Sequence, residues 1–134
     1  MRPRELGELM LRKAKEDQFT VEKLTPDPAS PDAVIGFHAQ QAVEKMLKGV
    51  LALHAVRYIP THNLLKLLDL LNENRISFPE GFKEVGRLTP FAATFRYADM
   101  AEPLPGSFDR SLTLKWVRQV RSWAEAVLRE QSDR

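Results

Sequence analysis

The chain has 134 residues, a formal net charge of +2 and no cysteine, which excludes a disulfide framework, a thiolate metal site and a thiol nucleophile. Its charged N-terminal residues lack the apolar core of a signal peptide, and no run approaches the roughly 18 apolar residues that span a bilayer. We therefore expect one soluble, cytoplasmic domain over residues 1–134. Twelve of the 20 basic residues are arginine, but the low net charge favours a mixed-charge surface over a concentrated nucleic-acid footprint.

Two long helices are predicted in the first half of the chain. The first covers about residues 4–24 and ends at the three prolines of segment 25–32. The second covers about residues 31–56, with Ser30 as its N-cap and Pro31 at its first position. One face of this second helix is apolar, and the opposite face carries Gln40, Gln41, Glu44, Lys45 and Lys48.

Three further helical segments are predicted in the second half. Thr61 is expected to cap a short, leucine-rich helix over residues 64–72. The capping-box spacing of Ser77 and Glu80 starts a fourth helix near residue 78, which Thr89-Pro90 kinks or splits before a segment over 91–100.

The last helix follows the break at residues 101–106. Ser107 or Asp109 is its expected cap, and Trp116 and Trp123 lie in its buried stripe. No stretch alternates polar and apolar residues as a strand would. The fold class is therefore all-α, with five helical segments in an antiparallel bundle.

Candidate binding groups occur in the second helix and in the loop after it. His38 shares one helical side with Gln41, Lys45 and Lys48, a stripe that could hold a phosphate or be the solvated back of a helix. His62 lies in the first turn of the third helix, where backbone N–H groups attract anions, although hydrogen bonding to its own loop is the favoured interpretation. His54 is expected in the core or an interface. No metal or cofactor site is indicated, because the histidines are not at ligand spacing and no glycine-rich phosphate loop is present.

A second candidate group is Phe95-Arg96-Tyr97-Ala98-Asp99. Arg96 could contact a phosphate with two N–H groups, and Tyr97 offers a ring on which a base could stack. The alternative is an Arg96–Asp99 pair that closes a helix end, with Tyr97 half-buried.

Four features together resemble the HEPN domain family. They are the segment FHAQQAVEKMLKGVL (37–51), the turn THNL (61–64), the leucine-rich third helix, and FRYAD (95–99), where relatives often have Arg-Tyr-Pro-Asp. The resemblance implies an up-and-down four-helix bundle with an additional short helix, paired as a homodimer with a polar cleft between subunits. It also implies a minimal nucleotidyltransferase as protein partner, in a toxin–antitoxin-like pair, and makes Tyr97 a candidate for modification by that partner.

Some HEPN relatives are metal-independent ribonucleases with an R-x(4–6)-H motif late in the bundle. No histidine follows Arg96 at those spacings, so the nuclease proton transfer has no group at the usual place. Arg57 and His62 match R-x4-H, but they lie in a loop elsewhere, and with twelve arginines we interpret the match as coincidence.

These observations predict a binding module without an assigned catalytic residue. A nucleotide, an RNA or the nucleotidyltransferase would bind a cleft lined by Arg96, Tyr97, Lys45, Lys48, His62 and Gln41. The alternatives are a ribonuclease that combines Arg96 with His62, and a structural helical dimer without a ligand.

Overall fold

The computed structural model describes residues 1–58, 60–94 and 108–132. Its elements are α1 (Pro3–Leu24), α2 (Asp32–Leu53), α3 (Leu64–Glu73), the 3₁₀ helix η1 (Glu80–Leu88), α4 (Phe91–Thr94) and α5 (Arg110–Ser132). These ranges contain no β-strand, which confirms the all-α class.

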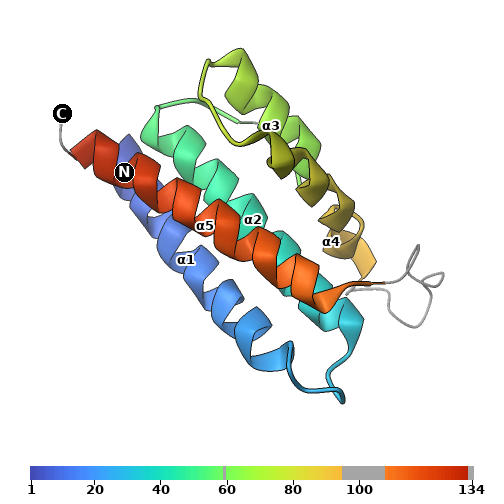
Figure 1. Ribbon diagram of the computed structural model, residues 1–134. Helices are drawn as coiled ribbons and strands as arrows, with labels where there is room; N and C mark the ends of the chain where they lie inside the picture. The colour runs from blue at the N-terminus through green and yellow to red at the C-terminus, as the bar shows by residue number, and fades with distance from the viewer. Residues whose placement is uncertain (59, 95–107, 133–134) are drawn as a thin grey trace.

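Helix α2 is the centre of the molecule. It contacts α1, α3, η1, α4 and α5, and 14 of its 22 residues are buried. In Figure 1 the long helices α1, α2 and α5 lie side by side, with α2 antiparallel to α1, while α3, η1 and α4 lie on the other side of α2. Helix α2 therefore packs against its neighbours on most sides, and not on one face alone.

Helices α1 and α2 approach closely where Gly7 faces Gly49. A Cβ atom on Gly7 would lie 2.6 Å from Cγ of Leu53 and 2.9 Å from the carbonyl oxygen of Gly49. Real Cβ atoms do not come this near, so glycine at position 7 is what permits this separation of the helix axes.

Helices α2 and α3 end in the same way. Val56 N–H donates to the carbonyl of Leu51 at 2.9 Å, and Ile76 N–H donates to that of Leu71 at 2.9 Å, each closing a Schellman motif. The residues in the left-handed position are Ala55 (φ 57°) and Arg75 (φ 59°), not glycine. The predicted end of α2 at residue 56 is thus three residues too late.

The predicted cap at Ser30 is wrong. Pro31 occupies the N-cap position of α2 without a side-chain cap, and the buried Ser30 hydroxyl has no hydrogen-bond partner among the described residues. The backbone of this loop is held from α5 instead. The Arg110 guanidinium donates to the Asp32 carboxylate at 2.8 Å and to three loop carbonyls, those of Thr25, Asp27 and Ser30.

The third helix begins at Leu64 as predicted and ends one residue later than predicted, but its cap is not Thr61. The Asn63 side chain accepts the N–H groups of Leu65 at 3.0 Å and Lys66 at 3.3 Å. The Thr61 hydroxyl accepts the N–H of Asn63 at 3.0 Å, so it shapes the turn that precedes the helix. For α5, the predicted cap at Asp109 is confirmed by its contact with the Leu112 N–H at 2.9 Å.

The predicted fourth α-helix is a 3₁₀ helix over Glu80–Leu88, followed after Thr89-Pro90 by the short α4. The capping box was wrong, because Pro79 is the N-cap and no side chain caps it. Phe82, Val85 and Leu88 are buried at a spacing of three, which matches the three residues per turn of a 3₁₀ helix. The predicted break at Thr89-Pro90 is confirmed, and the predicted residues 95–100 of the next segment lie outside the described residues.

Candidate functional site

The polar residues of α2 are less exposed than their number suggests. Gln40 is fully buried and Glu44 is 4% exposed, because neighbouring elements surround α2. The sequence placed them on an outward face, and this is wrong for both. His38, Gln41, Lys45 and Lys48 remain partly exposed along one stripe of the helix.

Glu44 is the centre of one polar cluster. Its Oε1 accepts Nδ1–H of His62 at 2.7 Å and an amide N–H of Gln40 at 2.8 Å, and its Oε2 accepts the Lys48 ammonium at 3.0 Å. The same Gln40 amide donates to the His62 carbonyl at 3.2 Å, and Gln41 donates to Oε1 of Gln40 at 2.7 Å. We call these five residues the Glu44 cluster. The three hydrogen bonds to the Glu44 carboxylate compensate part of the cost of burying it.

The orientation of His62 follows from this cluster. An ionised carboxylate only accepts hydrogen bonds, so Nδ1 carries the proton and Nε2 is left as an acceptor in the neutral ring. The His62 side chain is 64% exposed, in contrast to Glu44. Within the described residues Nε2 has no partner, and a ligand can reach it.

Asp17 on α1 is the centre of a separate cluster. Its carboxylate accepts the Lys45 ammonium at 2.6 Å and Nδ1–H of His38 at 2.9 Å. Asp17 is only 8% exposed. The predicted stripe of cations is therefore divided, since Lys45 and Lys48 each pair with a different carboxylate. Asp17 was not predicted as a site residue, although it lies at helical spacing from Ala14 and Val21, two apolar residues that α1 buries.

Tyr58 joins the surroundings of Glu44 and was not among the predicted residues. Burial raises the pKa of its hydroxyl, and the charge of Glu44 raises it further. The Lys48 ammonium lies 5.6 Å from the centroid of the Tyr58 ring. This ring helps to shield Lys48 and Glu44 from water.

Of the six predicted site residues, the structure brings Gln41, Lys48 and His62 into the Glu44 cluster and ties Lys45 to Asp17. Arg96 and Tyr97 lie outside the described residues, as does Asp99. His54, expected in the core or an interface, is half-buried and bonds the Val50 carbonyl through Nδ1 at 2.9 Å.

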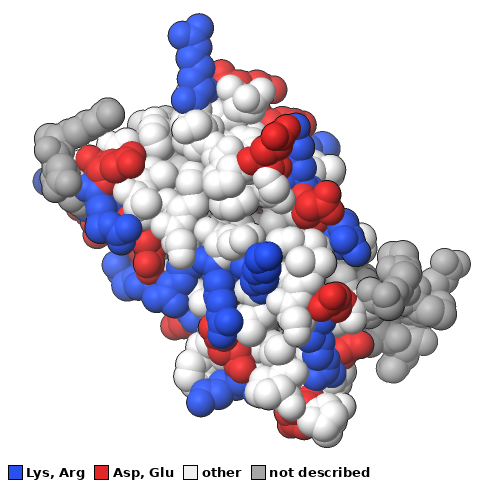
Figure 2. Space-filling model, in the orientation of Figure 1, with Lys and Arg blue, Asp and Glu red and all other residues white. Residues whose placement is uncertain are grey.

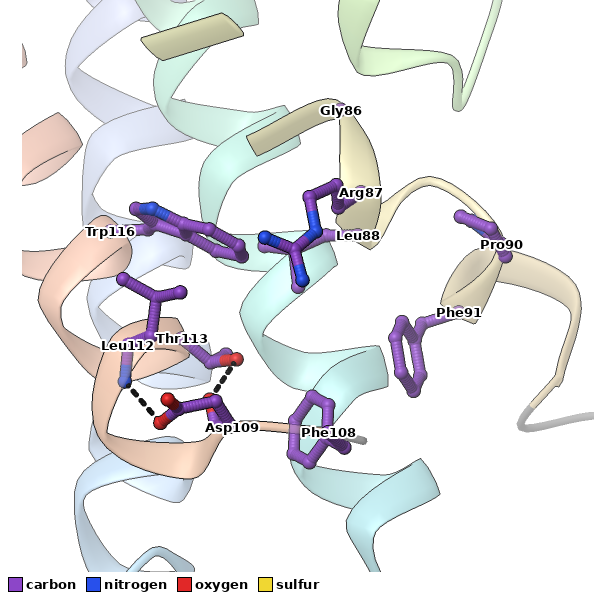
Figure 3. A pocket seen from close by; sticks show the side chains of 10 residues that line it. All are labelled: Gly86, Arg87, Leu88, Pro90, Phe91, Phe108, Asp109, Leu112, Thr113 and Trp116. Atoms are coloured by element: carbon purple, nitrogen blue, oxygen red, sulfur yellow. Dashed lines mark hydrogen bonds between the residues drawn. The ribbon is translucent and has the colours of Figure 1, made fainter. Parts of the chain in front are cut away.

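A separate pocket of about 280 Å³ lies between η1, α4 and the start of α5 (Figure 3). Phe91 and Phe108 form one side, and the Arg87 guanidinium lies 5.4 Å from the centroid of the Trp116 ring. One carboxylate oxygen of Asp109 accepts the Leu112 N–H and so caps α5. None of the predicted site residues that the structure describes lines this pocket.

Other searches of the described residues are negative. No group of three or more His, Asp or Glu side chains there could hold a metal ion. Within the same ranges, no helix has the length and apolar character needed to cross a membrane.

In a comparison with protein families, residues 8–132 match the HEPN domain. Searches of curated proteins and of solved structures gave no significant match. The match extends from the first helix to the last and includes the helical residues of both carboxylate clusters. The chain belongs to the HEPN domain family.

Proposed function

We propose that this protein binds a nucleotide or RNA as a homodimer, and that it acts with a minimal nucleotidyltransferase in a toxin–antitoxin-like pair. Its HEPN membership supports a nucleotide- or RNA-related role in general terms, and HEPN domains commonly dimerise. The observation that carries the proposal is the Glu44 cluster, which holds an exposed imidazole in one orientation at the surface.

The Glu44 cluster suits recognition of a polar, anionic ligand. The Gln41 and Lys48 side chains lie on the partly exposed stripe of α2, and the more exposed His62 ring shares the Glu44 cluster with them. In its protonated form His62 donates from Nε2 to a phosphate oxygen, and in its neutral form it accepts a hydroxyl proton. Pairing with Glu44 lowers the net positive charge, so we expect moderate affinity governed by geometry more than by long-range attraction.

Arg96 and Tyr97 complete the proposed site. The guanidinium of Arg96 would bind a phosphate in a bidentate manner, and the ring of Tyr97 would stack on a base. Lys45 would supply additional positive potential further along α2.

The test is a titration of ATP and of a short RNA against wild type, Arg96→Ala and His62→Ala. We expect about tenfold weaker binding in each variant, the effect of one lost charge-assisted contact. Arg129→Ala, at an exposed position near the end of α5, is the matched control and should bind as wild type does. Equal affinity in all four proteins, or binding in none of them, contradicts the site.

The orientation of His62 favours one alternative, a metal-independent ribonuclease. A carboxylate that holds Nδ1–H leaves Nε2 ready to accept the proton of a ribose hydroxyl, which is the role the missing motif histidine would have. Purified protein should then cleave RNA in the presence of EDTA, and His62→Ala should reduce the rate by about 100-fold or more. Absence of cleavage at high protein concentration, or cleavage unaffected by His62→Ala, removes this alternative.

A further inference from the structure

A groove of about 640 Å³ runs between η1 and the middle of α5. It is lined on one side by Pro79 and Phe82, and on the other by residues of α5 between Ser111 and Trp123. None of the residues of the Glu44 or Asp17 clusters lines it, so the groove is separate from the site proposed above.

The floor of this groove is a fixed aromatic surface. The rings of Phe82 and Trp123 meet edge to face with centroids 5.4 Å apart, and Phe78 stacks on Phe82 at 6.2 Å. The indole N–H of Trp123 donates to the Ser77 carbonyl at 3.1 Å, which fixes the ring plane. An apolar side chain that enters the groove would meet a preformed surface and would not have to order it.

The α5 side of the groove is polar and basic. Lys115, Arg118, Gln119 and Ser122 are exposed, and their spacing places them on one face of the helix. Figure 2 shows Lys and Arg side chains across the middle of the molecule, where Figure 1 places α5, next to an uncharged area.

The charge of this wall is positive. No Asp or Glu is among the described residues that line the groove. Arg118 pairs with Glu22 of α1, whereas Lys115 forms no ion pair within the described ranges of the chain. A carboxylate of a binding partner would therefore find a cation here that is not already neutralised.

We propose that the groove between η1 and α5 docks an amphipathic acidic segment of a partner protein. Apolar side chains of the segment would cover the exposed Pro79 and the half-buried Trp123, and its carboxylates would face Lys115, since Arg118 already pairs with Glu22. A nucleic acid fits less well, because Phe82 is only 4% exposed and offers no open ring face for a base. Tracking a phosphate backbone also requires a series of cations, and this wall has two.

The test selects displayed random peptides of about 16 residues on the full-length protein, and then measures the affinity of the enriched peptides by fluorescence anisotropy. We expect sequences that combine apolar residues with Asp or Glu. Lys115→Glu should weaken their binding by about tenfold or more, because one attraction becomes a repulsion. Lys13→Glu on the exposed surface of α1 makes the same charge change away from the groove and should leave affinity within about twofold.

Trp123→Phe tests the floor, since it retains an aromatic ring but loses the contact with Ser77. Circular dichroism establishes that each variant is folded, and folded Trp123→Phe should bind the peptides more weakly. Three results would overturn the proposal. They are enriched peptides indifferent to Lys115→Glu, a 12-nucleotide oligouridylate that depends on Lys115 while the peptides do not, and a homodimer in sedimentation that Lys115→Glu dissociates.

Discussion

Glu44 shows how a single buried carboxylate can organise a surface. Its side chain is 6% exposed, yet it is bonded by an imidazole, an amide and an ammonium. Removal of a charge from such a cluster leaves the opposite charge in a place where water cannot fully solvate it. The cluster thus links the stability of α2 to the orientation of His62.

Glu44→Gln should lower the free energy of unfolding by about 3 kcal/mol, because Lys48, whose side chain is 12% exposed, loses its counter-charge. Urea denaturation measures this change. The double variant Glu44→Gln/Lys48→Met should lose less than the sum of the two single variants. As a control, Glu84→Gln breaks an exposed pair of 3.8 Å with Arg87 and should cost under about 0.5 kcal/mol. Additive effects of the two substitutions at positions 44 and 48 would show that the charges are not coupled.

A contact in the site could be predicted from the sequence only where its two residues are close together along the chain. The Glu44–Lys48 pair is local, four residues apart on one helix, and helical spacing alone brings such a pair together. The partner of Lys45 is 28 residues away on α1, and the partner of His62 is 18 residues away on α2. Those pairings depend on how α1 and the loop before α3 pack on α2, and helical spacing carries no information about that packing.

At the scale of the helices, the residues with positive φ determine where α2 and α3 end. Ala55 and Arg75 hold the left-handed conformation that glycine adopts without steric cost. No glycine follows either helix to mark its end, and α2 was predicted three residues too long, whereas the predicted end of α3 was within one residue. The segment from residue 80 was predicted as an α-helix and is a 3₁₀ helix. The spacing of three in Phe82, Val85 and Leu88 does not distinguish the two, because it also fits part of a 3.6 period.

Ala55→Gly should therefore raise the free energy of unfolding by about 1 kcal/mol, because it relieves the Cβ clash of the left-handed conformation. Ala55 is exposed, so little packing is lost with its methyl group. The same substitution at Ala126, within the regular turns of α5, should instead cost about 1 kcal/mol. Thermal or urea unfolding measures the free energy of unfolding of both variants. If both substitutions lower it, the left-handed helix end assigned to Ala55 is wrong.

At the scale of the whole molecule, ion pairs connect the first and last helices. The Arg118 guanidinium binds Glu22 of α1, and Lys15 of α1 lies 3.4 Å from Glu125 of α5. The hydrogen bond from Arg118 lowers the pKa of Glu22, although burial opposes it. Burial raises the pKa of Glu125, but Arg121 and Lys15 outweigh this and lower it on balance.

A lowered pKa in the folded state makes stability depend on pH in one direction. The unfolded chain binds protons at the ordinary carboxyl pKa of 4.5, before the folded chain does. The stabilisation by these two carboxylates is therefore complete above pH 4.5, the pKa of the unfolded chain. It is lost as the pH falls through their lower pKa values in the folded state. The wild type should become less stable between about pH 5 and pH 3, and Glu22→Gln/Glu125→Gln should show a shallower decline over this interval.

Urea denaturation at a series of pH values measures both profiles. The pairs are partly exposed, with 59% of the Arg118 side chain accessible, so solvent and salt screen them. The difference between wild type and the double variant should accordingly shrink when the series is repeated at about 1 M salt. If the two profiles are parallel at low salt, acid sensitivity arises elsewhere in the molecule, and the contacts between α1 and α5 hold through apolar packing without a net contribution from these carboxylates.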